Sequence, residues 1–146
     1  MNKIWQRDSN GCKEPEPGAP LVSIVDDDPS VRRSTRRLLR CSGLRAEAFS
    51  TGEDFLRSEC VAETSCLILD VRMPGIDGLE LQRRLGKAGR TIPIVFLTAR
   101  ASDEEERQAW QAGAVNFLRK PIAKNALLDA IQAVLENSTN NRRRDL

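Results

Sequence analysis

Five polar side chains follow short apolar runs in this chain, at the point where each run ends. They are Asp26, Asp27, Asp70, Thr98 and Lys120. Because the carboxyl ends of parallel strands meet at one edge of an open α/β sheet, where ligands collect, we expect these side chains to converge there. Three carboxylates can hold a hard divalent cation, and one of them can act as a nucleophile toward phosphorus. The spacing therefore indicates a site for phosphoryl transfer.

The triplet Asp26-Asp27-Asp28 has an ordinary explanation as a helix cap. Aspartate is a preferred N-cap residue, and Asp28 stands directly before Pro29, as a cap would. Asp26 and Asp27 exceed what one cap requires, and neighbouring carboxylates repel each other unless a cation neutralises them. Magnesium takes oxygen ligands and leaves positions for water and a substrate phosphate. We therefore expect Mg²⁺ at Asp26 and Asp27, with Asp28 as the cap.

Asp70 precedes the loop at residues 71–75, so turn formation is one explanation for it. If the strands that end at Val25 and Leu69 are neighbours, Asp70 shares a pocket with the first two aspartates. Its carboxylate can then attack a phosphoryl donor and form an aspartyl phosphate.

Lys120 and Thr98 also have ordinary alternatives, as a solvated surface lysine and a strand-end threonine. At the carboxyl edge of the sheet, the ammonium group would instead bind a phosphoryl group as a point charge, and the hydroxyl would hydrogen-bond to a phosphoryl oxygen. Catalysis would then consist mainly of positioning and charge neutralisation.

Short β-branched runs alternate with amphipathic segments five times from residue 21 onward, which predicts βα units around a parallel sheet. The expected strands span residues 21–25, 45–49, 65–70, 92–97 and 115–119. The expected helices span residues 29–42, 51–60, 77–87, 103–112 and 124–136. The expected boundary signals are capping boxes at Ser50/Glu53 and Ser102/Glu105, and C-cap glycines at Gly43 and Gly113. Right-handed crossovers would place helices on both faces of the sheet.

The composition excludes several kinds of chemistry. The 146 residues carry 23 basic and 21 acidic side chains, and a net charge of +2 does not by itself indicate nucleic acid binding. Histidine is absent, which excludes Cys/His zinc sites, His-activated nucleophiles and phosphohistidine in this chain. With no long apolar stretch and no signal-peptide core, the sequence predicts a cytoplasmic protein without a membrane partner.

The chain is long enough for one domain. Residues 1–20 combine charge with proline and glycine, and we expect them to form a disordered leader. Residues 21–137 would form the domain, and residues 138–146 a flexible tail.

Four segments together resemble the receiver domain of two-component response regulators. They are Val25-Asp26-Asp27-Asp28-Pro29-Ser30-Val31-Arg32, Leu67-Ile68-Leu69-Asp70-Val71-Arg72-Met73-Pro74-Gly75-Ile76-Asp77-Gly78, Phe96-Leu97-Thr98-Ala99 and Phe117-Leu118-Arg119-Lys120-Pro121. The resemblance extends over about residues 21–137. It implies a flavodoxin-like (βα)5 fold, a doubly wound parallel sheet with strand order 2-1-3-4-5.

The resemblance also implies a role for each matching residue. Asp70 would be the phosphoacceptor, and Asp26, Asp27, Asp70 and the backbone carbonyl of Arg72 would hold Mg²⁺. Thr98 and Lys120 would sense the phosphoryl group, and the bond before Pro121 would be cis. Beyond Mg²⁺-dependent self-phosphorylation and slow autodephosphorylation, no enzyme activity is implied.

The same resemblance predicts a switch and its partners. Phe117 would turn inward as Thr98 moves toward the phosphoryl group, altering a surface made by residues 103–136. The phosphodonor would be a sensor histidine kinase or a phosphotransfer protein, and the altered surface would form a homodimer. In this family the residues two positions after the phosphoacceptor and the threonine tune phosphoryl loss. Here both are arginines, Arg72 and Arg100, which would hinder an attacking water and prolong the phosphorylated state. Solvated surface charge is the ordinary alternative for both.

A second basic feature is the first helix, which carries Arg32, Arg33, Arg36, Arg37 and Arg40. A solvated polar face is the ordinary explanation, and steering of an acidic kinase surface is the functional one. The stripe alone does not indicate direct nucleic acid binding by this chain.

Other functions fit the residues less well. A haloacid-dehalogenase-type phosphatase would place a second carboxylate where Arg72 stands, a flavin phosphate would meet three aspartates, and a GTPase would need a glycine-rich lysine loop. The motifs are most like those of receivers in the helix-turn-helix (nitrogen-fixation and LuxR-type) class. The chain would then be either a free-standing receiver or an excised part of a transcription factor, with a non-phosphorylated interaction module as the remaining alternative.

Overall fold

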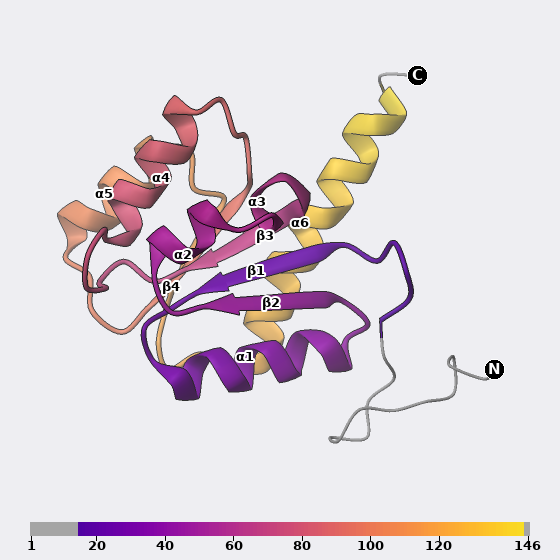
Figure 1. The fold of residues 1–146 in the computed structure, drawn as a ribbon, viewed down its shortest axis with the longest axis horizontal. Helices are drawn as coiled ribbons and strands as arrows, with labels where there is room; N and C mark the ends of the chain where they lie inside the picture. The colour runs from indigo at the N-terminus through magenta and orange to yellow at the C-terminus, as the bar shows by residue number, and fades with distance from the viewer. Residues whose placement is uncertain (1–14, 145–146) are drawn as a thin grey trace.

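The structure is a computed structural model that describes residues 15–144. A central sheet holds five parallel strands in the order β2-β1-β3-β4-β5, as expected. The strands are β1 (Leu21–Val25), β2 (Arg45–Phe49), β3 (Thr64–Leu69), β4 (Ile94–Thr98) and β5 (Asn116–Arg119). The helices are α1 (Pro29–Cys41), α2 (Gly52–Arg57), α3 (Cys60–Glu63), α4 (Gly78–Lys87), α5 (Asp103–Gln111) and α6 (Lys124–Arg144). Figure 1 shows the helices on both sides of the sheet.

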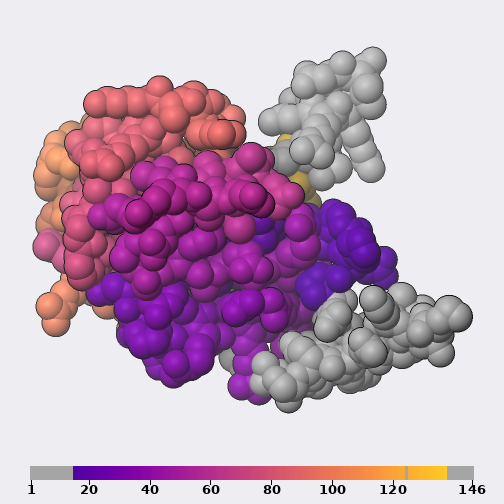
Figure 2. Space-filling model, in the orientation of Figure 1, coloured from indigo at the N-terminus to yellow at the C-terminus, as the bar shows by residue number. Residues whose placement is uncertain are grey.

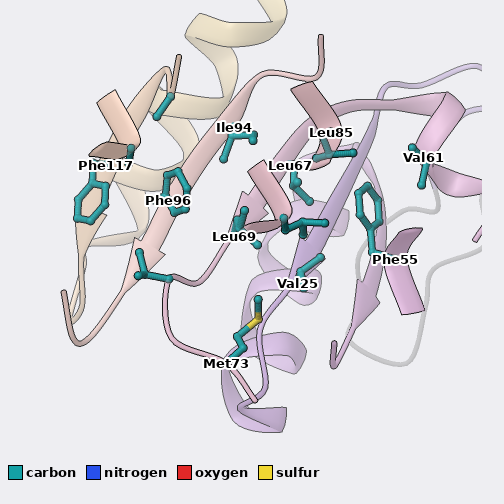
Figure 3. Close-up of a cluster of buried hydrophobic side chains, with 14 residues drawn as sticks. Val25, Phe55, Val61, Leu67, Leu69, Met73, Leu85, Ile94, Phe96 and Phe117 are labelled. Carbon is teal, nitrogen blue, oxygen red and sulfur yellow. The ribbon is translucent and has the colours of Figure 1, made fainter. Parts of the chain in front are cut away.

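Alternation along the strands divides the core into two layers, because successive side chains point to opposite faces of a sheet. Leu67 and Leu69 of β3 face one layer, together with Phe55 of α2 (Figure 3). Ile68, between them, faces the other layer, where Ile131 of α6 packs. The β1 and β3 runs are apolar almost throughout because both of their faces are covered.

Helices α2, α3, α4 and α5 cover the first layer, and α1 and α6 cover the second. In the space-filling view, residues of α2, α3 and α4 form a continuous surface over the sheet (Figure 2). Among residues 15–144, no helix has both the length and the apolar character needed to cross a bilayer.

Several predicted helix boundaries are confirmed. The Asp28 carboxylate accepts a hydrogen bond from the Ser30 N–H at 2.9 Å, with Pro29 at the start of α1. Ser102 and Glu105 form both hydrogen bonds of a capping box at α5. Gly43 follows α1 with a φ of 85°, a backbone conformation that glycine adopts without strain.

The segment after β2 differs from its prediction. Residues 51–60 were expected to form one helix with a capping box at Ser50 and Glu53, but α2 begins one residue later, with Thr51 as the N-cap. The helix ends before Ser58, whose backbone is extended and whose hydroxyl donates to the Phe55 carbonyl at 2.7 Å. This local hydrogen bond competes with helix continuation, and α3 forms separately.

The last helix is longer than predicted. The apolar pattern ends near residue 136, but α6 continues to Arg144, because no proline or glycine follows to stop it. Most of the segment expected as a tail, residues 138–146, is therefore helical in its backbone. Residues 1–14 of the expected leader and residues 145–146 lie outside the described residues.

Candidate functional site

Backbone hydrogen bonds continue the strand ladders one residue beyond the strands and so align the candidate site residues. The Asp70 N–H donates to the Val25 carbonyl at 3.0 Å, and the Lys120 N–H donates to the Thr98 carbonyl at 2.8 Å. Since the sheet is parallel, these side chains emerge at the same edge as Asp26.

The three carboxylates converge as expected. Asp26, Asp27 and Asp70 each place an oxygen within 4.8 Å of the others. Asp26 and Asp70 are buried, with exposed fractions of 3% and 8%, whereas Asp27 is exposed. Carboxylate oxygens are the ligands that Mg²⁺ prefers, and the exposed side leaves access for water. The donor set therefore fits a hard divalent cation.

Lys120 lies against this acidic cluster. Its Nζ is 2.8 Å from Asp26 Oδ2 and 3.9 Å from Asp70 Oδ2, and its side chain is 19% exposed. A single ammonium group therefore balances only part of the charge of three carboxylates. The bond between Lys120 and Pro121 is cis, as the resemblance implied.

Burial raises the pKa of Asp70 above its ordinary value, and the negative charge of Asp26 raises it further. The nearby Thr98 hydroxyl lowers the pKa of Asp70, and so, to a smaller extent, do the Lys120 ammonium and the Arg72 N–H. Ionised Asp70 is the nucleophilic form, so a cation that neutralised the neighbouring carboxylates would favour the reactive state.

Thr98 reaches the same edge, but its hydroxyl bonds to its own loop. The side chain is fully buried, and its Oγ1 donates to the Arg100 carbonyl at 3.0 Å and accepts from the Arg100 N–H at 3.3 Å. To bind a phosphoryl oxygen, the hydroxyl would have to exchange the Arg100 carbonyl for that new acceptor. In this structure the Thr98 hydroxyl therefore ties the end of β4 to the loop that follows it.

Arg72 contributes its backbone and its side chain in different directions. Its N–H donates to Asp70 Oδ1 at 3.4 Å, whereas its guanidinium pairs with Glu105 of α5 at 2.8 Å. The role of its carbonyl as a metal ligand stays a prediction.

Comparison with known proteins identifies the family. Residues 22–132 match the response regulator receiver domain. The chain belongs to this family. It is 41% identical over 122 residues to nodulation protein W of Bradyrhizobium diazoefficiens, covering 84% of this chain and 54% of that protein. It is 39% identical over 126 residues to response regulator protein TodT of Pseudomonas putida, covering 86% and 56%. The chain thus spans about half the length of the curated relatives it matches.

The solved structure of the response regulator StyR superposes with a TM-score of 0.79 at 42% identity, covering 88% of this chain and 65% of that one. The predicted fold and strand order are confirmed. The chain is a receiver domain of the phosphorylation-activated signalling kind. The five candidate residues lie at the carboxyl edge of its sheet, as expected.

Phe117, the expected switch residue of this receiver domain, is turned inward. It is 8% exposed, and its ring centroid lies 5.6 Å from that of Phe96 (Figure 3). The guanidinium of Arg119 lies 5.5 Å from the Phe117 ring centroid and pairs with Glu106 at 2.8 Å. Phenylalanine has no hydroxyl to keep hydrated, which favours this buried position.

Two contacts around the receiver site were not predicted from the sequence. A Cβ atom at Gly78 would lie 2.2 Å from the Asp70 carbonyl oxygen, so only glycine lets α4 start this close to Asp70. The signal in the sequence was the glycine itself, because glycine is common where two backbone segments approach closely. The second is the pair between Arg72 and Glu105, which no local pattern in the sequence connects.

Proposed function

We propose that Asp70 of this receiver domain accepts a phosphoryl group from a phosphohistidine of a sensor histidine kinase or phosphotransfer protein, with Mg²⁺ as cofactor. The convergence of Asp26, Asp27 and Asp70 beside the Lys120 ammonium supports this proposal more than any other observation. A cluster with excess negative charge accepts a further anionic group only if cations balance it.

In the proposed reaction, an Asp70 carboxylate oxygen attacks phosphorus. The phosphorus–nitrogen bond of the donor breaks, its electron pair returns to the imidazole nitrogen, and that nitrogen takes a proton. Asp26, Asp27, Asp70 and the Arg72 carbonyl would hold Mg²⁺, which when bound supplies charge neutralisation. Lys120 is near enough to Asp70 to pair with a phosphoryl oxygen after transfer.

Thr98 would read the new group. Its hydroxyl leaves the Arg100 carbonyl and donates to a phosphoryl oxygen, which moves the loop after β4. Phe117 stays packed inside, and the surface formed by residues 103–136 takes a second arrangement. Trp110 and Val115 on this surface are 43% and 44% exposed, and we propose it as the homodimer contact formed on phosphorylation.

We further propose that this receiver is cytoplasmic and belongs to the helix-turn-helix class, acting within a longer regulator or by docking to a partner. The supporting observation is that a relative named transcriptional regulatory protein TdiR, of Thauera aromatica, is 40% identical over 117 residues. Residues 21–137 would form the receiver unit, preceded by the leader and followed by the tail. We propose no direct nucleic acid contact by residues of this chain.

Acetyl phosphate with Mg²⁺ tests the proposed chemistry, because it supplies a phosphoryl group without a kinase. Intact-mass measurement is expected to show one added phosphoryl group on the wild-type protein. Asp70→Asn should show none, whereas Asp77→Asn, which alters an exposed aspartate of the following loop and preserves a capping side chain, should behave as wild type. An adduct of equal yield on Asp70→Asn would contradict the assignment of Asp70.

A further inference from the structure

One ion pair joins the phosphoacceptor loop to α5. Arg72 Nη2 lies 2.8 Å from Glu105 Oε1, although the two residues are 33 positions apart in the chain. The Arg72 side chain is 58% exposed and the Glu105 side chain 23%. The backbone of Arg72 lies beside the acidic cluster, because its N–H donates to Asp70 Oδ1. The ion pair therefore holds the Arg72 guanidinium at α5, although the Arg72 backbone lies beside Asp70.

Glu105 is held in place by its own helix. It is the third residue of α5, and its Oε1 accepts from the Ser102 N–H at 2.9 Å while its N–H donates to Ser102 Oγ at 3.1 Å. A carboxylate fixed by a capping box presents a stationary partner to Arg72. The position of the Arg72 guanidinium therefore depends on the position of the first turn of α5.

We infer that Glu105 is a positioning residue that shortens the lifetime of phospho-Asp70 by holding the Arg72 guanidinium away from the phosphoryl group. This inference rests on the proposed phosphorylation of Asp70. A phosphoryl group and the Glu105 carboxylate are both anions suited to the same guanidinium fork, so they compete for it. Arg72 covers the phosphoryl group only for the fraction of time that Glu105 releases it.

The step affected is hydrolysis. A water oxygen attacks phosphorus, the bond from phosphorus to the Asp70 oxygen breaks, and the carboxylate keeps the electron pair. Both protons of the water leave with the inorganic phosphate. A guanidinium hydrogen-bonded across the phosphoryl oxygens obstructs that water. Arg100, the other arginine expected to slow this step, is exposed in the loop after β4.

Glu105→Gln separates the ion pair from the helix cap, because glutamine also serves at the third position of a capping box. Glu104→Gln is a matched control, since Glu104 pairs with Arg107 of its own helix. Arg72→Ala and the double variant complete the cycle. Each protein is phosphorylated with acetyl phosphate and Mg²⁺, freed of donor by desalting, and followed by intact mass.

We expect the half-life of the phosphorylated protein to lengthen about two- to fivefold in Glu105→Gln, the range that an exposed ion pair can supply. Glu104→Gln should leave it unchanged, and Glu105→Gln should have no further effect once Arg72 is alanine. An unchanged or shorter half-life in Glu105→Gln, or the same lengthening in the Arg72→Ala background, would overturn the inference alone. Failure of every protein to gain a phosphoryl group would instead overturn the proposed function, and the inference with it.

Discussion

Replacing Asp70 with asparagine is expected to stabilise the metal-free protein. Asp70 is 8% exposed and shares with Asp26 and Asp27 a space in which carboxylate oxygens lie within 4.8 Å. At that separation, two unit charges repel by about 3 kcal/mol at an effective dielectric constant of about 20. Lys120, 3.9 Å from Asp70, offsets roughly one such repulsion. The repulsion from one carboxylate remains, and solvent screening of the exposed Asp27 reduces it. We therefore expect Asp70→Asn to raise the free energy of unfolding by about 1–2 kcal/mol.

The pH dependence of this gain follows from the raised pKa of Asp70. An acid whose pKa is higher in the folded than in the unfolded state destabilises the fold only where it is ionised. The cost is absent below the unfolded pKa, whose ordinary value is 3.8, grows as the pH rises from there to the folded pKa, and is constant above it. The difference between Asp70→Asn and wild type should therefore be largest near neutral pH and vanish at acid pH.

Urea unfolding followed by circular dichroism, in EDTA, measures this difference. Asp77→Asn is the control, with an expected change within about 0.5 kcal/mol. Added Mg²⁺ should stabilise wild type more than Asp70→Asn, because the variant lacks one ligand. A variant no more stable than wild type at neutral pH, or equally stabilised at pH below 4, would refute the electrostatic reasoning.

Three other substitutions test separate parts of the structure. Lys120→Met should destabilise the metal-free protein by about 3 kcal/mol, because the buried Asp26 carboxylate loses its ion-pair partner. A Mg²⁺ titration of the melting temperature should recover part of the loss. Gly78→Ala should lower the free energy of unfolding by at least about 2 kcal/mol, since its Cβ would clash with the Asp70 carbonyl, and calorimetry should show weaker Mg²⁺ binding. Gly86→Ala in the same helix has free space around its Cβ and should raise the free energy of unfolding by about 1 kcal/mol. Ser102→Ala should lose about 1 kcal/mol in urea unfolding through the α5 cap, and an unchanged midpoint would contradict that role for the cap.

Local patterns predicted the elements that local forces control. The inner strands β1, β3 and β4 and the polar residues at their ends were predicted because a buried run must be apolar on both faces and ends where a polar side chain appears. Caps such as Asp28 and Ser102 were predicted because their hydrogen bonds close within three residues. The N-cap of α2 was predicted one residue too early, at Ser50 in place of Thr51. The other two errors, the break at Ser58 and the length of α6, lie where neither a stop signal nor an apolar pattern marks the boundary.

The sequence by itself determined which residues stand at the ends of strands, and therefore which chemistry the carboxyl edge can hold. Only the tertiary structure decided that Asp26, Asp27 and Asp70 lie within 4.8 Å, that Lys120 pairs first with Asp26, and that Arg72 is held by Glu105. These distances depend on strand order, register and the packing of α5 against the sheet. Such long-range contacts arise from the burial of both sheet faces together, and no short stretch of the chain encodes them.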